Sequence, residues 1–133
     1  MENNQEILFR LSMFEQQLQQ LQQQLQAVSR GIIDLETLHL GLDEITGSID
    51  KEVFAQIGKG IYVKAKIVSE ELNVNIGDNN FVNKSIPQTK ELIMGQIKRL
   101  KDVEIELERN IEVTNNEFIE MIEEYRKIEK TEE

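Results

Sequence analysis

Several residue types on which common functions depend are missing from the sequence or nearly so. Its 133 residues include no cysteine, no tryptophan, one histidine and one proline. The absence of cysteine excludes a disulfide framework and a thiolate zinc site, and it fits the reducing cytosol, so we expect a cytoplasmic protein. A single histidine argues against multi-histidine metal sites and catalytic histidine pairs within one chain, and nothing in the sequence calls for a cofactor.

Positive charge and long apolar runs are also scarce. Fifteen lysines and arginines stand against 25 acidic residues, which gives a formal net charge of -10. Nucleic acids and anionic lipid surfaces both attract basic proteins, so we expect no nucleic acid and no membrane as a partner. The apolar runs are a few residues long, whereas a membrane helix needs about 20. The first residues, MENNQE, show neither the basic nor the apolar segment of a secretory signal.

Two long stretches of heptad spacing take the place of a wide apolar core. Residues 1–47 and 85–130 each carry apolar side chains at alternating intervals of four and three, with mostly polar residues between them. This spacing predicts two helices with one narrow apolar stripe each. Pro87 fits the first turn of the second helix, and Ser85 is a suitable residue to cap its start. The stripes consist of Ile7, Leu11, Phe14, Leu18, Leu21, Leu25, Val28, Ile32, Leu35, His39 and Leu42, and of Ile93, Ile97, Leu100, Glu104, Leu107, Ile111, Thr114, Phe118, Met121, Tyr125 and Ile128.

Residues 51–84, between the two stretches, change to a period of two. Alternating residues on either side of Gly58–Gly60 predict one β-hairpin, and the same pattern on either side of Gly77–Asn80 predicts another. Two isolated hairpins are marginal in water and leave open strand edges, so we expect strands of several chains to join. The residues assigned to this oligomerisation are Val53, Ala55, Ile57, Ile61, Val63, Ala65, Ile67, Leu72, Val74, Ile76, Phe81 and Val82.

The predicted fold class is α+β, in a single domain of residues 1–133. Because each stripe needs a partner, we expect a long antiparallel coiled coil with the hairpins at one end and both termini at the other. The hairpins would contribute to a β-barrel platform shared between subunits. For each pair of facing residues, the two residue numbers would then sum to about 135. This register places Phe14 near Met121, and it places Glu104 near Arg30, where an ion pair is possible.

More apolar residues surround the two chain ends than one stripe requires. Leu8, Phe9 and Met13 lie off the first stripe, and Ile119 and Ile122 lie off the second. Such residues either pack locally or are covered by another subunit, or else they form an adaptable surface that binds varied partners. The candidate binding surface comprises Ile7, Leu8, Phe9, Leu11, Met13, Phe14, Phe118, Ile119, Met121, Ile122, Tyr125 and Ile128.

The central hairpins resemble those of a known family. Residues Gly58–Ile67, GKGIYVKAKI, resemble the first hairpin of prefoldin alpha-class subunits, with its short glycine turn and its Val-Lys-Ala strand. Residues Val74–Lys84 resemble the second hairpin, although Gly77–Asn80 replaces the small Gly-Ala-Gly turn, and Leu21–Val28 is also typical of the family. Two hairpins instead of one indicate the alpha class rather than the beta class.

The resemblance implies a function as well as a fold. In prefoldin, two alpha and four beta subunits assemble through a double β-barrel from which six coiled coils hang. The tips of these coiled coils hold non-native polypeptides and pass them to a group II chaperonin without hydrolysing a nucleotide. By this resemblance we expect an ATP-independent holdase whose partners are prefoldin beta subunits in an alpha2beta4 heterohexamer, non-native client proteins and a group II chaperonin.

Two other classes of function compete with this interpretation. For an enzyme, acidic pairs such as Glu123 and Glu124 are expected anyway on solvated helix faces, and His39 lies in the stripe, where a neutral imidazole is the simpler explanation. Gly58–Gly60 is too short for a phosphate-binding loop. A non-chaperone coiled-coil scaffold or adaptor is the stronger rival. It predicts a regular heptad out to both chain ends, with few apolar residues off the stripe.

Overall fold

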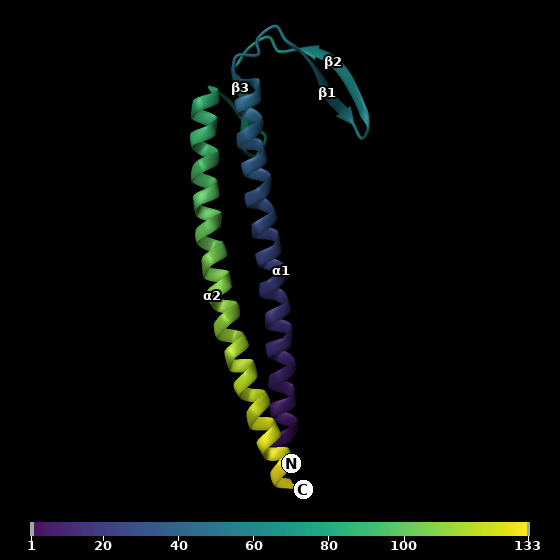
Figure 1. Ribbon diagram of the computed structural model, residues 1–133, viewed down its shortest axis with the longest axis vertical. Helices are drawn as coiled ribbons and strands as arrows, with labels where there is room; N and C mark the ends of the chain where they lie inside the picture. The colour runs from purple at the N-terminus through teal and green to yellow at the C-terminus, as the bar shows by residue number, and fades with distance from the viewer. Residues whose placement is uncertain (1, 133) are drawn as a thin grey trace. The chain divides into compact units, whose positions relative to one another are not determined.

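The computed structural model describes residues 2–132 of the chain (Figure 1). In chain order the elements are α1 (Glu2–Ile45), β1 (Glu52–Gly58), β2 (Ile61–Lys66), β3 (Leu72–Gly77), β4 (Asn80–Lys84) and α2 (Ile86–Glu132). This order confirms the predicted helix, two hairpins and helix. Contacts group the chain into two compact units, which we call the paired-helix unit (Met1–Ile32 with Arg99–Glu133) and the hairpin unit (Ile33–Lys98).

The chain leaves α1 through a polar turn. Gly47 takes a left-handed φ of 73°, which few residues other than glycine adopt without strain. The hydroxyls of Thr46 and Ser48 donate to the carbonyl oxygens of Leu42 and Glu44, each at 3.0 Å. These bonds occupy carbonyl groups that the last turn of a helix leaves without helical partners. The Thr-Gly-Ser sequence therefore ends α1 at Ile45, two residues before the end of the predicted helical stretch at residue 47.

Helix α2 begins with a reciprocal cap. The backbone N–H of Ser85 donates to the side-chain oxygen of Gln88 at 3.1 Å, and the backbone N–H of Gln88 donates to Ser85 Oγ at 3.2 Å. This arrangement is a capping box, which satisfies two amide groups at once. Pro87 lies within the first turn, where an N–H would have had no helical partner. The predicted cap at Ser85 is confirmed.

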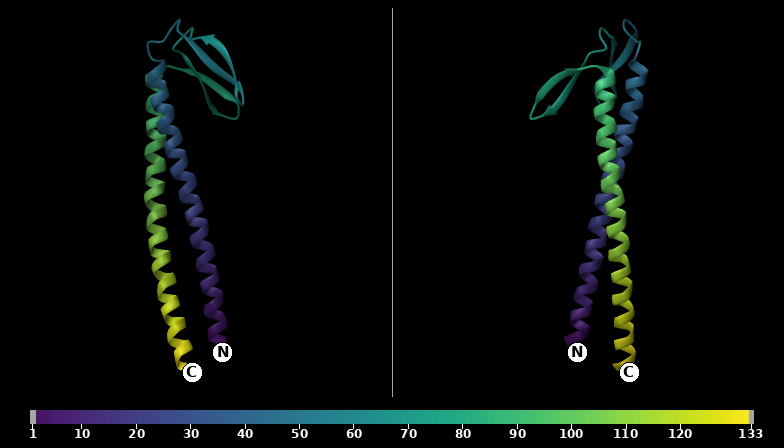
Figure 2. Two further views of the ribbon diagram at one scale, coloured as in Figure 1. Left: turned by 45° about the vertical axis from the view of Figure 1, so that its right-hand side comes forward. Right: turned by 90° about the vertical axis from the view of Figure 1, so that its left-hand side faces the viewer.

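In the paired-helix unit, segments of α1 and α2 run side by side in opposite directions, so the start of α1 and the end of α2 lie at the same end of the unit (Figures 1 and 2). Every residue of the predicted stripes within this unit is buried or half-buried. Ile7, Leu107 and Thr114 are among the most enclosed. Because each helix contributes one narrow stripe, the core is thin and the other faces of both helices stay in water.

Three contacts define the register of this helix pair. The rings of Phe14 and Phe118 meet edge to face, with centroids 6.5 Å apart and an interplanar angle of 61°. Ser29 Oγ donates to Glu104 Oε2 at 2.8 Å. Gly31 faces Leu100 across the seam, since a Cβ at this position would lie 3.5 Å from a methyl carbon of Leu100, an ordinary van der Waals contact. The residue numbers of these pairs sum to between 131 and 133.

The predicted register, with a sum of about 135, is therefore wrong by two to four residues. Phe14 packs on Phe118, although Met121 still lies nearby, and Glu104 bonds Ser29 instead of the expected Arg30. An offset of this size leaves apolar residues facing apolar residues, so heptad spacing alone discriminates weakly between the alternatives. Particular aromatic and polar pairs decide the register.

The hairpin unit carries two separate two-stranded antiparallel sheets, β1–β2 and β3–β4. Asp78 and Asn79 connect β3 to β4 with left-handed φ angles of 49° and 59°. A two-residue turn with both φ angles positive matches the twist of a hairpin, and Asn and Asp tolerate this conformation better than other side chains. The predicted turn at Gly77–Asn80 is confirmed. Within the described residues, no ladder of hydrogen bonds joins one sheet to the other.

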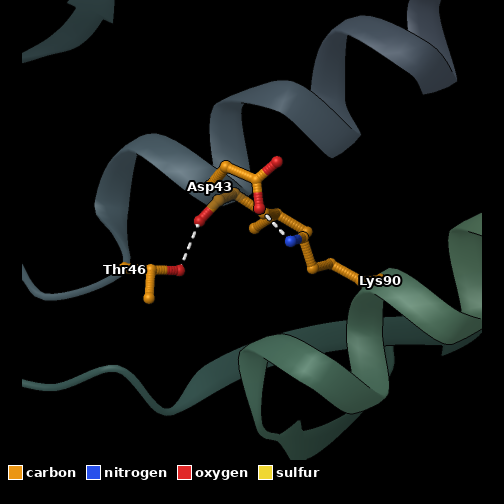
Figure 3. A network of polar contacts seen from close by, with 4 residues as sticks. Asp43, Thr46 and Lys90 are labelled. Atoms are coloured by element: carbon orange, nitrogen blue, oxygen red, sulfur yellow. Dashed lines mark hydrogen bonds and ion pairs between the residues drawn. The ribbon is translucent and has the colours of Figure 1, made fainter.

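Polar contacts attach the helix ends of the hairpin unit to each other and to the strand connections. Lys90 on α2 pairs with Asp43 on α1, beside the Thr46 hydroxyl that closes α1 (Figure 3). The backbone N–H of Gly47 donates to Glu70 Oε1 at 2.6 Å. Glu70 lies between β2 and β3, so this bond ties the connection of the two hairpins to the end of α1.

Candidate functional site

The residues predicted to form a binding surface near the chain ends all belong to the paired-helix unit, where they differ in exposure. Leu8, Phe9, Met13 and Ile119 are exposed to solvent. The remaining predicted residues are buried or half-buried: Ile7, Leu11, Phe14, Phe118, Met121, Ile122, Tyr125 and Ile128. The second group holds the helices together or lies beside the seam. The first group presents apolar surface that the chain itself does not cover.

A shallow groove of about 350 Å³ lies beside the seam in this unit. It is lined by Arg10, Met13, Phe14 and Gln17 of α1 and by Met121 of α2. The four α1 positions follow the spacing i, i+3, i+4 and i+7, which places them on one face of the helix. The structure thus brings together three predicted residues and two that sequence reasoning missed. The helical spacing of Arg10 and Gln17 from Met13 was the signal that could have found them.

Phe9 continues the apolar surface beyond the groove. It lies four residues before Met13 on α1, so the two side chains are neighbours on the helix surface. Phe9 is 67% exposed and Met13 is 52% exposed, far more than a side chain of the seam. Leu8 and Ile119 are exposed outside the groove lining. The paired-helix unit therefore offers several separate apolar contact points rather than one closed pocket.

Acidic side chains dominate the surroundings of the groove. Arg10 Nη2 lies 3.3 Å from Glu6 Oε1 one turn earlier on α1, and both side chains are more than half exposed. On α2, Glu117 and Glu124 lie four residues before and three residues after Met121, and both are exposed. Residues at these spacings share a helix face. The groove thus has a largely apolar lining, with exposed carboxylates within one helical turn of Met121 on α2 and a cation already paired on α1.

The residues predicted for oligomerisation lie on or next to the strands of the hairpin unit. Residues opposite each other in a ladder share a face, as Ala55 does with Val63 and Val74 does with Val82. The half-buried members of the predicted set are Ala55, Ala65, Ile67, Leu72, Val74 and Val82. The exposed members are Val53, Ile57, Ile61, Val63, Ile76 and Phe81. Half of this apolar set is therefore left in water by a single chain.

Apolar side chains also lie on the other face of each hairpin, which sequence reasoning missed for the first one. Phe54 and Tyr62 are exposed at positions that alternate with the predicted set. Phe81 lies opposite Asn75, on the face away from Val74 and its partner. The signal was present as large apolar residues at the off-phase positions of the two-residue repeat. Both faces of both sheets thus carry surface suited to packing.

Two kinds of feature are absent from the part of the chain that the structure describes, a cluster of metal-ligating side chains and a membrane-spanning helix. Within residues 2–132, no group of three or more histidine or acidic side chains is placed to hold a metal ion. No helix of this same part of the chain is both long and apolar enough to cross a membrane. His39 lies half-buried in the hairpin unit. What the two surfaces offer is apolar contact area bordered by charge.

Comparison with known proteins agrees with the fold. A family model described as prefoldin subunit matches residues 14–131. The prefoldin subunit alpha of Methanobrevibacter smithii is 30% identical over 98 residues, which cover 73% of this chain and 67% of that protein. A chain in the cryo-EM structure of filamentous PFD from Methanocaldococcus jannaschii matches with a TM-score of 0.76 at 19% identity, over 86% of this chain and 96% of that one.

Two long helices with two antiparallel hairpins between them define the class of the protein, a paired-helix subunit with a double-hairpin insert. The family model spans most of the sequence and the M. smithii relative is an alpha subunit, so the chain belongs to the prefoldin family as an alpha-type subunit. This is a family of chaperones and not of enzymes, and its subunits form oligomeric complexes with other subunits. The general role of the chain is that of a co-chaperone.

Proposed function

We propose that the chain is an ATP-independent holdase, which binds non-native polypeptides through exposed apolar residues of the paired-helix unit and passes them to a group II chaperonin. The observation that carries the proposal is the exposure of Leu8, Phe9, Met13 and Ile119 beside a stripe that is already closed. Large apolar side chains left in water beyond the needs of the fold are typical of interaction surfaces. Methionine adds an adaptable side chain, which suits partners of no fixed sequence.

Weak contacts of this kind become useful when several act together. A few exposed side chains on one chain give low affinity, but an assembly presents several copies to the same unfolded polypeptide. Binding of a second copy is then intramolecular, and avidity exceeds the affinity of a single contact by orders of magnitude. The net charge of -10 keeps the helices soluble while their apolar residues stay exposed. We place this activity in the cytoplasm.

We propose that the hairpins assemble the chain with prefoldin beta subunits into an alpha2beta4 heterohexamer. Support comes from the two separate sheets, each with open edges and apolar residues on both faces. Isolated two-stranded sheets are marginally stable, and neighbouring strands would pair the edges and cover the faces. A second candidate is a filament of this chain alone, because the M. jannaschii PFD structure with the same fold is filamentous. Native mass of the chain alone and with a beta subunit distinguishes the two assemblies.

A matched pair of triple variants tests the holdase proposal. Leu8→Ser, Phe9→Ser and Met13→Ser together remove exposed apolar residues near the chain ends. Val103→Ser, Ile105→Ser and Val113→Ser remove residues of similar exposure elsewhere in the same unit. We expect both variants to keep the helical circular dichroism and native mass of the unmodified assembly. Only the first should lose suppression of light scattering by a denatured client.

The alternative of a non-chaperone scaffold or adaptor makes the opposite forecast. A scaffold would leave client aggregation unchanged at any ratio, whereas a holdase suppresses scattering at near-stoichiometric amounts. Equal suppression by the Leu8, Phe9 and Met13 variant and by the unmodified chain would refute binding through these residues. The exposed residues off the stripe favour the holdase, because a scaffold needs a regular heptad and little more.

A further inference from the structure

We infer that the groove lined by Met13, Phe14 and Met121 prefers, among non-native polypeptides, segments in which a large apolar side chain lies next to lysine or arginine. The inference rests on the proposed function, since it names the clients that the binding surface favours. It depends on two independent features of the paired-helix unit, the lining of the groove and the charge around it.

The lining suits one large side chain of variable shape. Met13 on α1 and Met121 on α2 line the groove from opposite helices. The ring of Phe14 also lines the groove and packs against Phe118 in the seam. Thioether side chains adjust to the shape of an occupant, and the edge of an aromatic ring adds directional contact. A space of about 350 Å³ accommodates an aromatic or long aliphatic side chain without opening the seam. Phe9 extends the apolar contact along α1.

The charges that flank the groove leave a negative side. Arg10 is the cation in the lining, and its guanidinium is engaged by Glu6. On the α2 side, Glu117 and Glu124 lie within one helical turn of Met121 in either direction, and both are exposed. A chain segment whose apolar side chain enters the groove therefore places its neighbouring residues close to these two carboxylates. Lysine or arginine at those places is attracted, and aspartate or glutamate is repelled.

The wider charge distribution points the same way. Residues 1–17 and 117–133 contain ten acidic and four basic residues, a formal net charge of -6, whereas the 99 residues between them carry -4. More than half of the net charge thus belongs to a quarter of the chain, the part that contains the groove. At physiological ionic strength charges act over about 8 Å, so the effect is confined to client residues near the groove.

Fluorescence anisotropy with three labelled unstructured peptides tests the inference on the full-length chain in its assembled state. The peptides share one central phenylalanine–leucine pair and differ in the flanking residues, which are lysine, glutamine or glutamate. We expect the lysine peptide to bind about tenfold more tightly than the glutamate peptide at low salt, with glutamine between them, because each exposed charge pair contributes roughly two- to fivefold. The preference should fall below about twofold at 0.5 M NaCl.

Two variants assign the preference to this groove. Glu117→Gln with Glu124→Gln should remove most of the difference between the lysine and glutamate peptides. Glu106→Gln with Glu108→Gln removes the same charge on the same helix, at least nine residues from Glu117, and should leave the difference unchanged. Met13→Gln should weaken the binding of all three peptides by a similar factor of about three, since the substitution removes apolar contact and no charge.

The outcomes separate this inference from the proposed function. Equal binding of the three peptides by a chain that still suppresses client aggregation would overturn the charge preference and leave the holdase standing. A preference that survives Glu117→Gln with Glu124→Gln would overturn the assignment to this groove. Failure of every peptide to bind, together with no suppression of aggregation, would overturn both proposals.

Discussion

The helices of the paired-helix unit and the strands of the hairpin unit cover their apolar side chains to very different extents within one chain. In the paired-helix unit, helices satisfy their own backbone groups and each stripe covers the other, so the seam is complete. In the hairpin unit, two separate sheets keep open edges, and residues such as Ile57, Ile61 and Phe81 stay exposed on their strands. Two helices can cover each other's apolar stripes, whereas a two-stranded sheet leaves the backbone groups of both outer edges unpaired and is marginally stable alone.

The two units differ in the partners that they can take. We propose that the hairpin unit gains neighbouring strands in a defined register from other chains. The paired-helix unit has its apolar stripes covered, yet it exposes Phe9 and Met13 near the chain ends. Apolar surface beyond a covered stripe suits partners without defined geometry. We therefore propose specific assembly for the hairpin unit and adaptable binding for the paired-helix unit.

The largest effect should follow from placing a charge on the sheet face of the hairpin unit. Val63→Lys puts an ammonium opposite Ala55, on a face that we propose is covered in the assembly. Burying an unpaired lysine is strongly unfavourable, so subunit association should weaken by at least about a hundredfold. The native mass across a dilution series measures the strength of subunit association. Gln56→Lys, at an exposed position of the same hairpin that already carries a polar side chain, is the control, and equal effects of the two would contradict the burial of Val63 in the assembly.

A cavity in the seam should have the next largest effect, and it should lower the stability of the helix pair. Leu107 is 9% exposed, so Leu107→Ala removes buried methyl groups and should lower the free energy of unfolding by about 2–4 kcal/mol. Urea titration followed by circular dichroism measures this change. Val103→Ala, at a position of α2 that is 41% exposed, should cost less than about 0.5 kcal/mol. Similar losses in both variants would show that the stripe is not the core.

Replacing the acidic residue of the seam should stabilise the helix pair but loosen its register. Glu104 is half-buried and bonds Ser29, so Glu104→Leu adds apolar contact and should raise the free energy of unfolding by about 1 kcal/mol. Polar seam residues specify register, and their loss admits alternatives. Spin labels at Gln20 and Asn116 should report a broader distance distribution in the variant. An unchanged narrow distribution would show that the Phe14–Phe118 pair is sufficient.

Loss of the cap on α2 should have a moderate effect. Ser85→Ala removes the hydroxyl that accepts the N–H of Gln88 and should cost about 1 kcal/mol of unfolding free energy. The same urea titration measures it. Ser12→Ala, at an exposed position inside α1, should change stability by less than about 0.5 kcal/mol. If both serine variants behave alike, the capping box contributes little in this chain.

The smallest effect belongs to the exposed ion pair beside the groove. Arg10→Ala breaks the contact with Glu6, and pairs of this exposure contribute less than about 0.5 kcal/mol on a helix. Thermal unfolding should therefore shift by no more than one or two degrees. A loss several times larger would mean that Arg10 stabilises the helix pair through its stem, by packing over the groove rather than by its charge.

Much of the local structure was predictable because it depends on neighbours in sequence. The change of period at residues 51–84 located the hairpins, and Ser85 and the turn at Asp78 follow from backbone requirements of a helix start and a tight turn. The candidate groove was only partly predictable. Met13, Phe14 and Met121 stood out as apolar residues near the chain ends, whereas Arg10 and Gln17 joined them through helix geometry and the packing of α1 on α2.

The sequence by itself determined two helices, two hairpins and the stripes that pair, because periodicity is a property of each segment alone. Only the tertiary structure decided that Phe14 packs on Phe118 and that Glu104 bonds Ser29. It also decided which apolar residues near the chain ends are closed in the seam and which are left in water. These outcomes depend on contacts between residues 75 and 104 positions apart in the sequence. At such separations several offsets of a heptad repeat bury similar apolar area, and a few specific pairs select among them.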